Sequence, residues 1–275
     1  MIPAAFDYQR ASSADEAIAL IAEAGDEAKF LAGGHSLLPL MKLRLASPTV
    51  LVDVGRLTDL SYIRDGGDHV AIGALTRHHD IEHSPLLHEQ VPLLAHAASH
   101  VGDPQVRHRG TIGGSIAHAD PASDLPATVL ALGGSMVARS SRGERVIEAS
   151  AFFQGFLESS LEPDELLTEI RVPKLAGAGW GFQKFNRRAQ DWAIVGVAAW
   201  KHNGNAGVAL VNMGSTPVYA RSVVDALASG ASAAEAAEVA AAEAEPQADL
   251  NASPEYRVHL AKVLVRRALN AAGVA

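Results

Sequence analysis

The segment Ala32-Gly33-Gly34-His35-Ser36 is one of two glycine-pair segments that decide how this chain is interpreted, and the second is Thr111-Ile112-Gly113-Gly114-Ser115. Each follows a short apolar or mixed run and ends in a small hydroxyl residue. Glycine lacks the Cβ atom that would keep a ligand away from backbone N–H groups. Because converging amides form a concave anion site, we predict that the two segments hold the two phosphates of one dinucleotide from opposite sides.

The composition of the 275-residue chain is that of a folded protein. Hydrophobic residues make up 48% of it, and the net charge of −8 argues against a nucleic-acid surface, which should be basic. The chain has no cysteine, so it cannot by itself hold an iron–sulfur cluster or a thiolate metal site. Neither a signal peptide nor a membrane span is predicted, and we expect a cytoplasmic protein.

The first part of the chain alternates short strands and helices. Ser13 to Glu16 has the pattern of a capping box, and Gly25 is a plausible end for the helix that follows. Turn residues between short β-branched runs predict two hairpins. The expected strands are 29–32, 49–54, 61–64 with 69–72, 134–138 with 145–147, and 166–172, and the expected helices are 37–45, 124–132 and a region at 76–100 that Pro85 and Pro92 interrupt.

The last hundred residues have a different pattern. Three strand-like runs, 181–186, 193–201 and 206–213, predict an antiparallel meander. Helices are expected at 218–228, 233–244 and 254–271. Because the small-residue turn at 175–181 separates the two patterns, we place a domain boundary there, with domains at 1–174 and 175–275.

Several further segments accompany the glycine pairs in a fixed order. They are Asp120-Pro121-Ala122-Ser123-Asp124-Leu125-Pro126, Glu165-Leu166-Leu167, the stretch from Lys184 to Asp191-Trp192-Ala193, and Glu255-Tyr256-Arg257 with Arg266-Arg267-Ala268. With these segments the chain resembles, over its whole length, the FAD-binding medium subunits of the molybdenum hydroxylases, most closely the aerobic carbon monoxide dehydrogenase type. The resemblance implies an α+β fold of the FAD-binding PCMH type, similar to vanillyl-alcohol oxidase, with two α/β subdomains and a C-terminal antiparallel sheet with helices.

The resemblance also implies FAD as the cofactor. The pyrophosphate would lie on the backbone of the first glycine segment and on the backbone and hydroxyl groups of the second. Asp124 would accept hydrogen bonds from a sugar or adenine-side group, and Leu167 would supply backbone contacts and an apolar wall. Lys184 would lie near the pyrimidine edge of the flavin, where reduction adds negative charge. The implied cofactor-binding residues are Ala32, Gly33, Gly34, His35, Ser36, Thr111, Ile112, Gly113, Gly114, Ser115, Asp124, Leu167, Lys184 and Trp192.

Two details follow from these implied roles. Trp192 stands where this family usually carries a tyrosine beside the ring system, so an indole is expected to cover the flavin there. Valine at Gly33 or Gly113 is expected to abolish FAD retention while leaving most of the fold intact.

The implied function is electron transfer within a larger enzyme. By the family plan, a large molybdopterin subunit oxidises the substrate, and two [2Fe-2S] clusters of a small subunit pass electrons to FAD in this chain. A quinone or dioxygen would then accept them, and a dimer of heterotrimers is expected. No catalytic residue is assigned to this chain. The substrate stays open between carbon monoxide, aldehydes, purines and other N-heterocycles.

Alternative functions use the same residues differently. A stand-alone FAD oxidase or reductase of the same fold superfamily would act directly on a small molecule, and a flavin-free scaffold would only hold partners together. His79, Glu82 and His83 match the H-x-x-E-H pattern of some zinc hydrolases. Because a third ligand and a long helix are not evident, we expect a solvated helix face and no metal. Gly113 to Ala117 only loosely resembles a nucleophile elbow.

Overall fold

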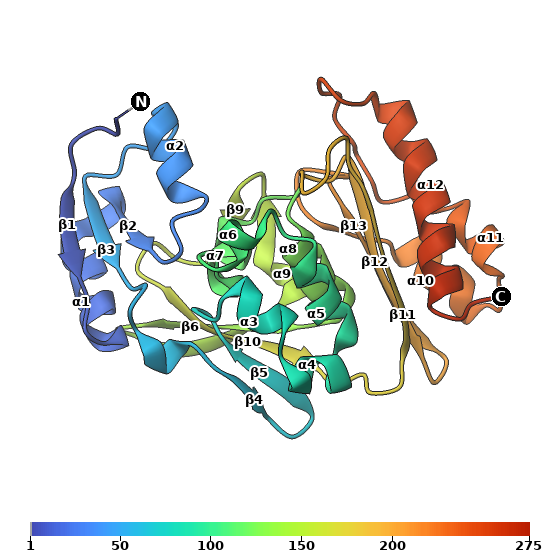
Figure 1. The fold of residues 1–275 in the computed structure, drawn as a ribbon, viewed down its shortest axis with the longest axis horizontal. Coiled ribbons are helices and arrows are strands. Elements are labelled where there is room, and N and C mark those ends of the chain that lie inside the picture. The colour runs from blue at the N-terminus through green and yellow to red at the C-terminus, as the bar shows by residue number, and fades with distance from the viewer. Residues whose placement is uncertain (1) are drawn as a thin grey trace.

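The computed structural model describes residues 2–275, in which three larger β-sheets and one small one are arranged in a row (Figure 1). The N-terminal unit, coloured blue, lies at one end. A five-stranded sheet with short helices above it lies in the middle, and the C-terminal unit, orange to red, lies at the other end. The α+β class predicted from the sequence is confirmed.

The N-terminal unit is a parallel three-stranded sheet with the order β1-β3-β2. Helix α1 begins after Ser13, whose hydroxyl accepts a hydrogen bond from the Glu16 amide, and ends at Gly25, which has a φ of +73°. The predicted unit of strand, glycine loop, helix and strand is confirmed. Its elements are β1 (Asp7–Arg10), α1 (Ala14–Ala24), the 3₁₀ turn Gly25–Glu27, β2 (Ala28–Leu31), α2 (Leu37–Leu43) and β3 (Val50–Asp53).

The central sheet is antiparallel, with the order β4-β5-β10-β6-β7. Both predicted hairpins are present, since β4 pairs with β5 and β6 pairs with β7. The apolar strand β10 takes the buried central position. The bounds are β4 (Ile63–Asp65), β5 (His69–Gly73), β6 (Ser135–Ser140), β7 (Gly143–Glu148) and β10 (Leu166–Pro173), with a 3₁₀ turn at Thr58–Leu60.

Short helices lie between the central sheet and the C-terminal sheet (Figure 1). Pro85, Pro92 and Pro104 each occupy the start of a helix, where the missing N–H has no intrahelical partner to lose. The prolines therefore begin these helices. The elements are α3 (His78–Glu82), α4 (Pro85–Gln90), α5 (Pro92–Ser99), α6 (Pro104–Arg107), α7 (Ile112–His118), α8 (Asp124–Ala131), α9 (Ala149–Phe152), β8 (Phe153–Gly155) and β9 (Glu158–Ser159).

The C-terminal unit is an antiparallel sheet, β11-β12-β13-β14, which confirms the predicted meander. Helices α10 to α12 cover its outer face, and α5 and α8 pack on the inner face (Figure 1). The bounds are β11 (Gly179–Phe185), β12 (Val195–His202), β13 (Asn205–Val211), β14 (Val218–Tyr219), α10 (Arg221–Ala228), α11 (Ala233–Ala237) and α12 (Pro254–Ala271).

Two of the expected C-terminal helices are shorter than predicted. The first begins at Arg221, because Val218 and Tyr219 pair with β13 as a strand. The second ends at Ala237 and continues as turns in which amides bind carbonyls three residues back. The chain must return to the sheet here, since the Glu245 amide donates to the Met213 carbonyl. Tertiary contacts override the helix propensity of alanine in this segment.

Apolar residues form one core for each unit of the fold. The largest extends from the central sheet through α5 and α8 to the inner face of the C-terminal sheet, and the others lie under α1 and under α10 to α12. Within residues 2–275, no helix combines the length and the hydropathy that crossing a bilayer requires.

Candidate functional site

A cavity of about 920 Å³ lies among the N-terminal unit, the segment from α6 to the start of α8, the β9 region and the loop that joins β11 to β12. Cofactor and ligand sites in proteins usually enclose about 300–1,000 Å³, so this cavity is large enough for a dinucleotide. Both glycine segments line it, as do Asp124, Leu167, Lys184 and Trp192. Of the residues predicted to bind the cofactor, only Ile112 does not line the cavity. Its side chain is fully buried in the core.

The first glycine segment is a loop that presents free backbone donors to this cavity. Within residues 2–275, the amides of Gly33, Gly34, His35 and Ser36 have no protein acceptor. Successive unengaged amides of this kind can form a concave anion site. Gly33 must be glycine for a packing reason, because a Cβ there would collide with the Arg109 carbonyl oxygen. This close approach places the two glycine segments side by side.

The second glycine segment is the first turn of helix α7, which corrects the expectation of an open turn. Thr111 is the N-cap, and its hydroxyl accepts a hydrogen bond from the Gly114 amide at 3.1 Å. The Ile112 and Gly113 amides donate to the carbonyls of Thr76 and Ala74, and the Ser115 amide donates to the Thr111 carbonyl. These amides are therefore already used within the protein. The groups left to contact a ligand are chiefly the hydroxyls of Thr111 and Ser115.

Gly113 also has a structural purpose. A Cβ at this buried position would lie 2.5 Å from the Ala74 Cβ and 2.6 Å from the Ala74 oxygen. Gly113 thus allows α7 to pack against the end of β5. Because the clash is with Ala74 in the core, we now expect valine at Gly113 to destabilise the chain, in place of the earlier expectation that most of the fold would stay intact.

Asp124 and Lys184 form a single buried ion pair at the cavity. The Lys184 Nζ lies 2.7 Å from the Asp124 Oδ2 atom, and the two side chains are only 5% and 6% exposed. Lys184 also donates to the His100 carbonyl at 2.9 Å. The two side chains thus meet at one place in the cavity, whereas the family resemblance implied a sugar or adenine-side contact for Asp124 and a ring contact for Lys184. Both roles stay predictions.

The Asp124 carboxyl has two further properties of a ligand-binding group. Its Oδ1 atom is buried and has no hydrogen-bond partner within the described residues. Burial raises the pKa of the Asp124 carboxyl from 3.8 to about 6, although the Lys184 ammonium opposes the rise. A buried acceptor without a partner costs free energy unless a ligand donor satisfies it.

The other predicted residues lie on the walls and at the edge of the cavity. Leu167 is buried in β10, beside an irregularity of the ladder between Leu167 and Glu169. The His35 imidazole is exposed, and its Nδ1 atom lies 3.0 Å from the Gly33 carbonyl oxygen. Trp192 is 59% exposed on the β11–β12 loop. The His35 imidazole and the Trp192 indole are thus both accessible.

His78 is a cavity residue that sequence analysis did not single out. It is 4% exposed, and its Nδ1 atom has no partner within residues 2–275. Burial lowers the pKa of the His78 imidazole from 6.5 to about 4, so it is neutral near neutral pH. Twelve histidines occur in the chain, and His79 follows directly. No sequence signal distinguishes the one that turns inward.

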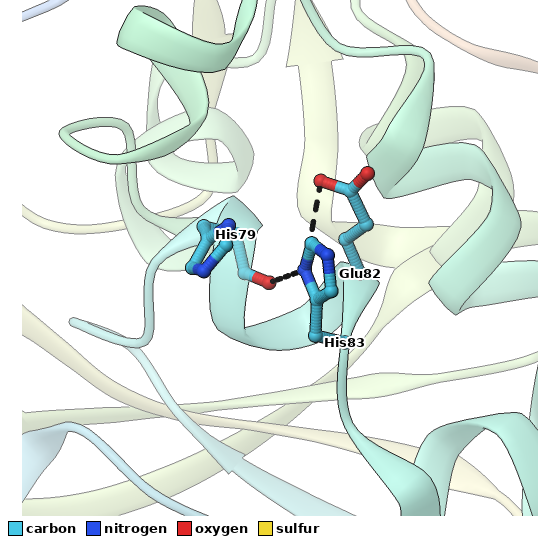
Figure 2. Close-up of side chains that lie close together, drawn as sticks. All are labelled: His79, Glu82 and His83. Carbon is cyan, nitrogen blue, oxygen red and sulfur yellow. Dashed lines mark hydrogen bonds and ion pairs between the residues drawn. The ribbon is translucent and has the colours of Figure 1, made fainter.

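His79, Glu82 and His83 of the H-x-x-E-H segment lie together at the end of α3 (Figure 2). One ligand atom from each lies within 4.8 Å of the others. Other contacts already engage them, because Arg107 Nε is 2.7 Å from the Glu82 carboxylate and His83 Nδ1 is 2.8 Å from the His79 carbonyl oxygen. Helix α3 has only five residues. These contacts describe the end of a short helix, and we assign no metal to it.

Comparison with known proteins gives the class to which this fold and cavity belong. The FAD-binding domain family of the molybdopterin dehydrogenases matches residues 4–175, and the carbon monoxide dehydrogenase flavoprotein C-terminal domain matches residues 180–272. The chain belongs to this family of FAD-binding molybdopterin dehydrogenase proteins. Its cofactor is FAD, and it is part of an oxidoreductase, as the sequence resemblance implied.

Particular relatives match over almost the whole chain. The chain is 43% identical to the carbon monoxide dehydrogenase medium chain of Hydrogenophaga pseudoflava, over 99% of this chain and 98% of that one. It is 38% identical to the 6-hydroxypseudooxynicotine dehydrogenase complex subunit alpha of Paenarthrobacter nicotinovorans, over 98% and 95% of the two chains. The solved carbon monoxide dehydrogenase from Hydrogenophaga pseudoflava covers 100% of both chains with a TM-score of 0.96 and 43% identity.

Proposed function

We propose that this chain is the FAD-carrying electron-transfer subunit of a heteromeric molybdenum hydroxylase of the carbon monoxide dehydrogenase type. Its similarity to a medium chain over nearly its full length supports this proposal. The observation that carries it concerns one cavity. Within residues 2–275, the amides at 33–36 and the buried Asp124 Oδ1 atom that face this ligand-sized space have no hydrogen-bond partner, so both are available to one ligand.

These groups fit the chemistry of FAD. The amides of Gly33 to Ser36 suit the diphosphate, and the hydroxyls of Thr111 and Ser115 add donors beside them. Leu167 would supply an apolar wall, and the exposed indole of Trp192, which also lines the cavity, would cover part of the flavin. Bound FAD supplies the redox chemistry, because it can take electrons singly from iron–sulfur clusters and release them singly or in pairs.

The buried ion pair would bind the pyrimidine edge of the flavin ring. That edge carries an N–H donor between two carbonyl acceptors, and the pair offers the complementary groups at one place. Asp124 Oδ1 is an acceptor without a partner in the described part of the chain, and Lys184 has a third N–H beyond the two that contact Asp124 and His100. In a site that excludes water, the ammonium of Lys184 also stabilises negative charge that reduction places on this edge.

The remaining redox centres and the substrate site are assigned to partner subunits. We propose a small subunit with [2Fe-2S] clusters as the electron donor, a large molybdopterin subunit that binds the substrate, and a dimer of these heterotrimers. A quinone or dioxygen would be the terminal acceptor. Names of relatives include both a carbon monoxide dehydrogenase and a 6-hydroxypseudooxynicotine dehydrogenase, which supports a common electron-transfer subunit serving different substrates.

We propose a domain boundary at residues 174 and 175. Strand β10 ends at Pro173 in the central sheet, and β11 begins at Gly179 in the C-terminal sheet. The first domain would hold most of the cavity, and the second would add Lys184 and Trp192 to it.

The test is to purify the chain alone and with its partner subunits. The full chain should bind one FAD per polypeptide, and the flavin absorption should bleach only when a reduced [2Fe-2S] partner is supplied. A chain that stays free of FAD after addition of the cofactor would contradict the proposal. Turnover of a small substrate by the isolated chain would instead favour the stand-alone oxidase or reductase.

A further inference from the structure

We propose that Arg257 is a positioning residue for the cofactor cavity, although it lies on α12 and does not line the cavity itself. It would act through the Trp192 loop, defined as residues 186–193, and through the segment that leads into Asp124. This inference rests on the proposed function in one respect only, which is that the cavity holds FAD.

Arg257 is a charged residue in the interior of the C-terminal unit. Its side chain is 2% exposed, and its Nη2 atom lies 2.6 Å from the partly exposed Asp249 carboxylate. The Nη1 atom donates to the carbonyl oxygens of Ile194 and, at 3.3 Å, Asn212. A buried ion pair often contributes little net stability compared with an apolar replacement. The two backbone acceptors therefore suggest a role in holding the chain in position.

The Ile194 carbonyl lies directly after the Trp192 loop, where the chain enters β12. The Ile194 amide donates to the Phe185 carbonyl at 2.7 Å and so closes the loop. One residue earlier, the Ala193 carbonyl accepts a hydrogen bond from Asn212 Nδ2 at 2.7 Å. Arg257 and Asn212 together thus hold two successive carbonyl groups directly after Trp192.

The same network reaches the segment before Asp124. The Asn212 backbone amide donates to the Pro121 carbonyl at 2.8 Å. Pro121 lies in the turn that leads to Asp124, the first residue of α8. One buried guanidinium therefore connects α12 directly to the end of the Trp192 loop and, through Asn212, to the turn before Asp124. Asn212 has a φ of +61°, which asparagine tolerates better than most residues, so this junction is sterically demanding.

The experiment compares Arg257→Met, Arg257→Lys and Leu264→Ala in the full chain, with and without FAD. Hydrogen exchange of residues 186–194 and 119–123 and the Kd for FAD are measured. We expect Arg257→Met to accelerate exchange in both segments and to raise the Kd about tenfold, as for the loss of a buried hydrogen bond to a charged group. Arg257→Lys should keep most of the wild-type protection of these two segments against hydrogen exchange.

Leu264→Ala is the matched control. Leu264 is buried on the same helix, and its apolar side chain makes no hydrogen bond to the residues around Ile194. It should lower the unfolding midpoint without accelerating exchange in the two segments. If Arg257→Met does not fold, Asn212→Gly removes the bond to Ala193 and tolerates the positive φ.

Unchanged exchange and unchanged Kd in Arg257→Met would overturn the inference, and so would equal effects in Leu264→Ala. A failure of the proposed function can be distinguished from a failure of this inference. A wild-type chain that binds no FAD contradicts the function, whereas exchange in the FAD-free chain still tests the role of Arg257.

Discussion

Lys184 and Asp124, which are 60 residues apart in the chain, meet at 2.7 Å between Nζ and Oδ2 at the cofactor cavity. Both charged groups are buried, and the Lys184 ammonium also donates a hydrogen bond to the His100 carbonyl. The pair joins the first turn of α8 to strand β11 of the C-terminal sheet. Its removal therefore affects both the stability of the chain and the binding of FAD.

Breaking the pair on one side should be more harmful than removing both charges. Lys184→Met leaves the Asp124 carboxylate buried without its partner, which costs about 3–5 kcal/mol for a buried pair. The double variant Lys184→Met, Asp124→Asn should lose less stability than Lys184→Met alone, and therefore less than the sum of the two single variants. Urea unfolding of the FAD-free chain measures these free energies. Additive losses would show that the two side chains are not coupled.

FAD affinity should depend on the protonation of Asp124. Burial raises the pKa of this carboxyl to about 6, and the carboxylate is the form that accepts a hydrogen bond at Oδ1. Affinity should therefore fall as the pH is lowered through about 6, by about tenfold for each pH unit below that value. Titration with FAD between pH 5 and 8 measures this slope. The slope should vanish in Asp124→Asn, and the same slope in both proteins would refute the assignment.

His78 should make the FAD-free chain less stable in mild acid. Burial lowers the pKa of this imidazole to about 4 in the folded chain, whereas the unfolded value is near 6.5. Between these values only the unfolded chain binds the proton, so stability falls as pH decreases from 6.5 to 4, by on the order of 3 kcal/mol. The raised pKa of Asp124 acts in the opposite direction over part of this range, so a comparison with a variant is needed.

The comparison for His78 is His78→Gln, which cannot titrate. The difference in unfolding free energy between this variant and the wild type should change with pH between 4 and 6.5 and be constant above 7. A difference that does not change with pH would show that the pKa of His78 is the same in the folded and unfolded chains.

Alanine at the two glycine segments should have different effects. At Gly33 a Cβ would collide with the backbone carbonyl of Arg109 and displace the 33–36 loop, so FAD affinity should fall at least about tenfold and the chain should lose about 1–3 kcal/mol of stability. At Gly113 the Cβ would strike Ala74 in the core, so the chain should lose about 3 kcal/mol of stability. Thermal unfolding and FAD titration separate the two effects.

Gly230→Ala is the control for these variants. Gly230 has a φ of +89°, no atom near an added Cβ, and no position at the cavity. It should lose about 1 kcal/mol of stability and retain the wild-type affinity for FAD. Equal losses of FAD in all three variants would contradict the role of the 33–36 loop.

Substitution of Trp192 should change the affinity for FAD more than the stability of the chain. Because its side chain is 59% exposed, Trp192→Ala should change the unfolding free energy of the FAD-free chain by less than about 0.5 kcal/mol. The FAD Kd should rise several-fold, and Trp192→Tyr should retain most of the affinity. Titration with FAD and thermal unfolding together test this. A loss of stability without a change in Kd would show that the indole only packs against the protein.

Local sequence patterns predicted the elements that are controlled by nearby residues. The Ser13 cap, the two hairpins and the final helix at 254–271 were all predicted in the correct places. The prediction of an open turn at the second glycine segment was wrong, because a glycine pair by itself is typical of a turn. In the structure the segment starts a helix, and its Ile112 and Gly113 amides donate to the distant Thr76 and Ala74 carbonyls. The Val218–Tyr219 strand likewise depends on its partner strand.

The sequence by itself determined the α+β class, the family resemblance and the choice of FAD, because short motifs with special backbone requirements can be recognised in order along the chain. Only the tertiary structure decided which amides stay free at 33–36, that Asp124 and Lys184 form one pair, and that Arg257 connects α12 to the Trp192 loop. Those features depend on which distant groups meet in a low-dielectric interior, where a hydrogen bond or a charge partner is decided by contact and not by separation along the chain.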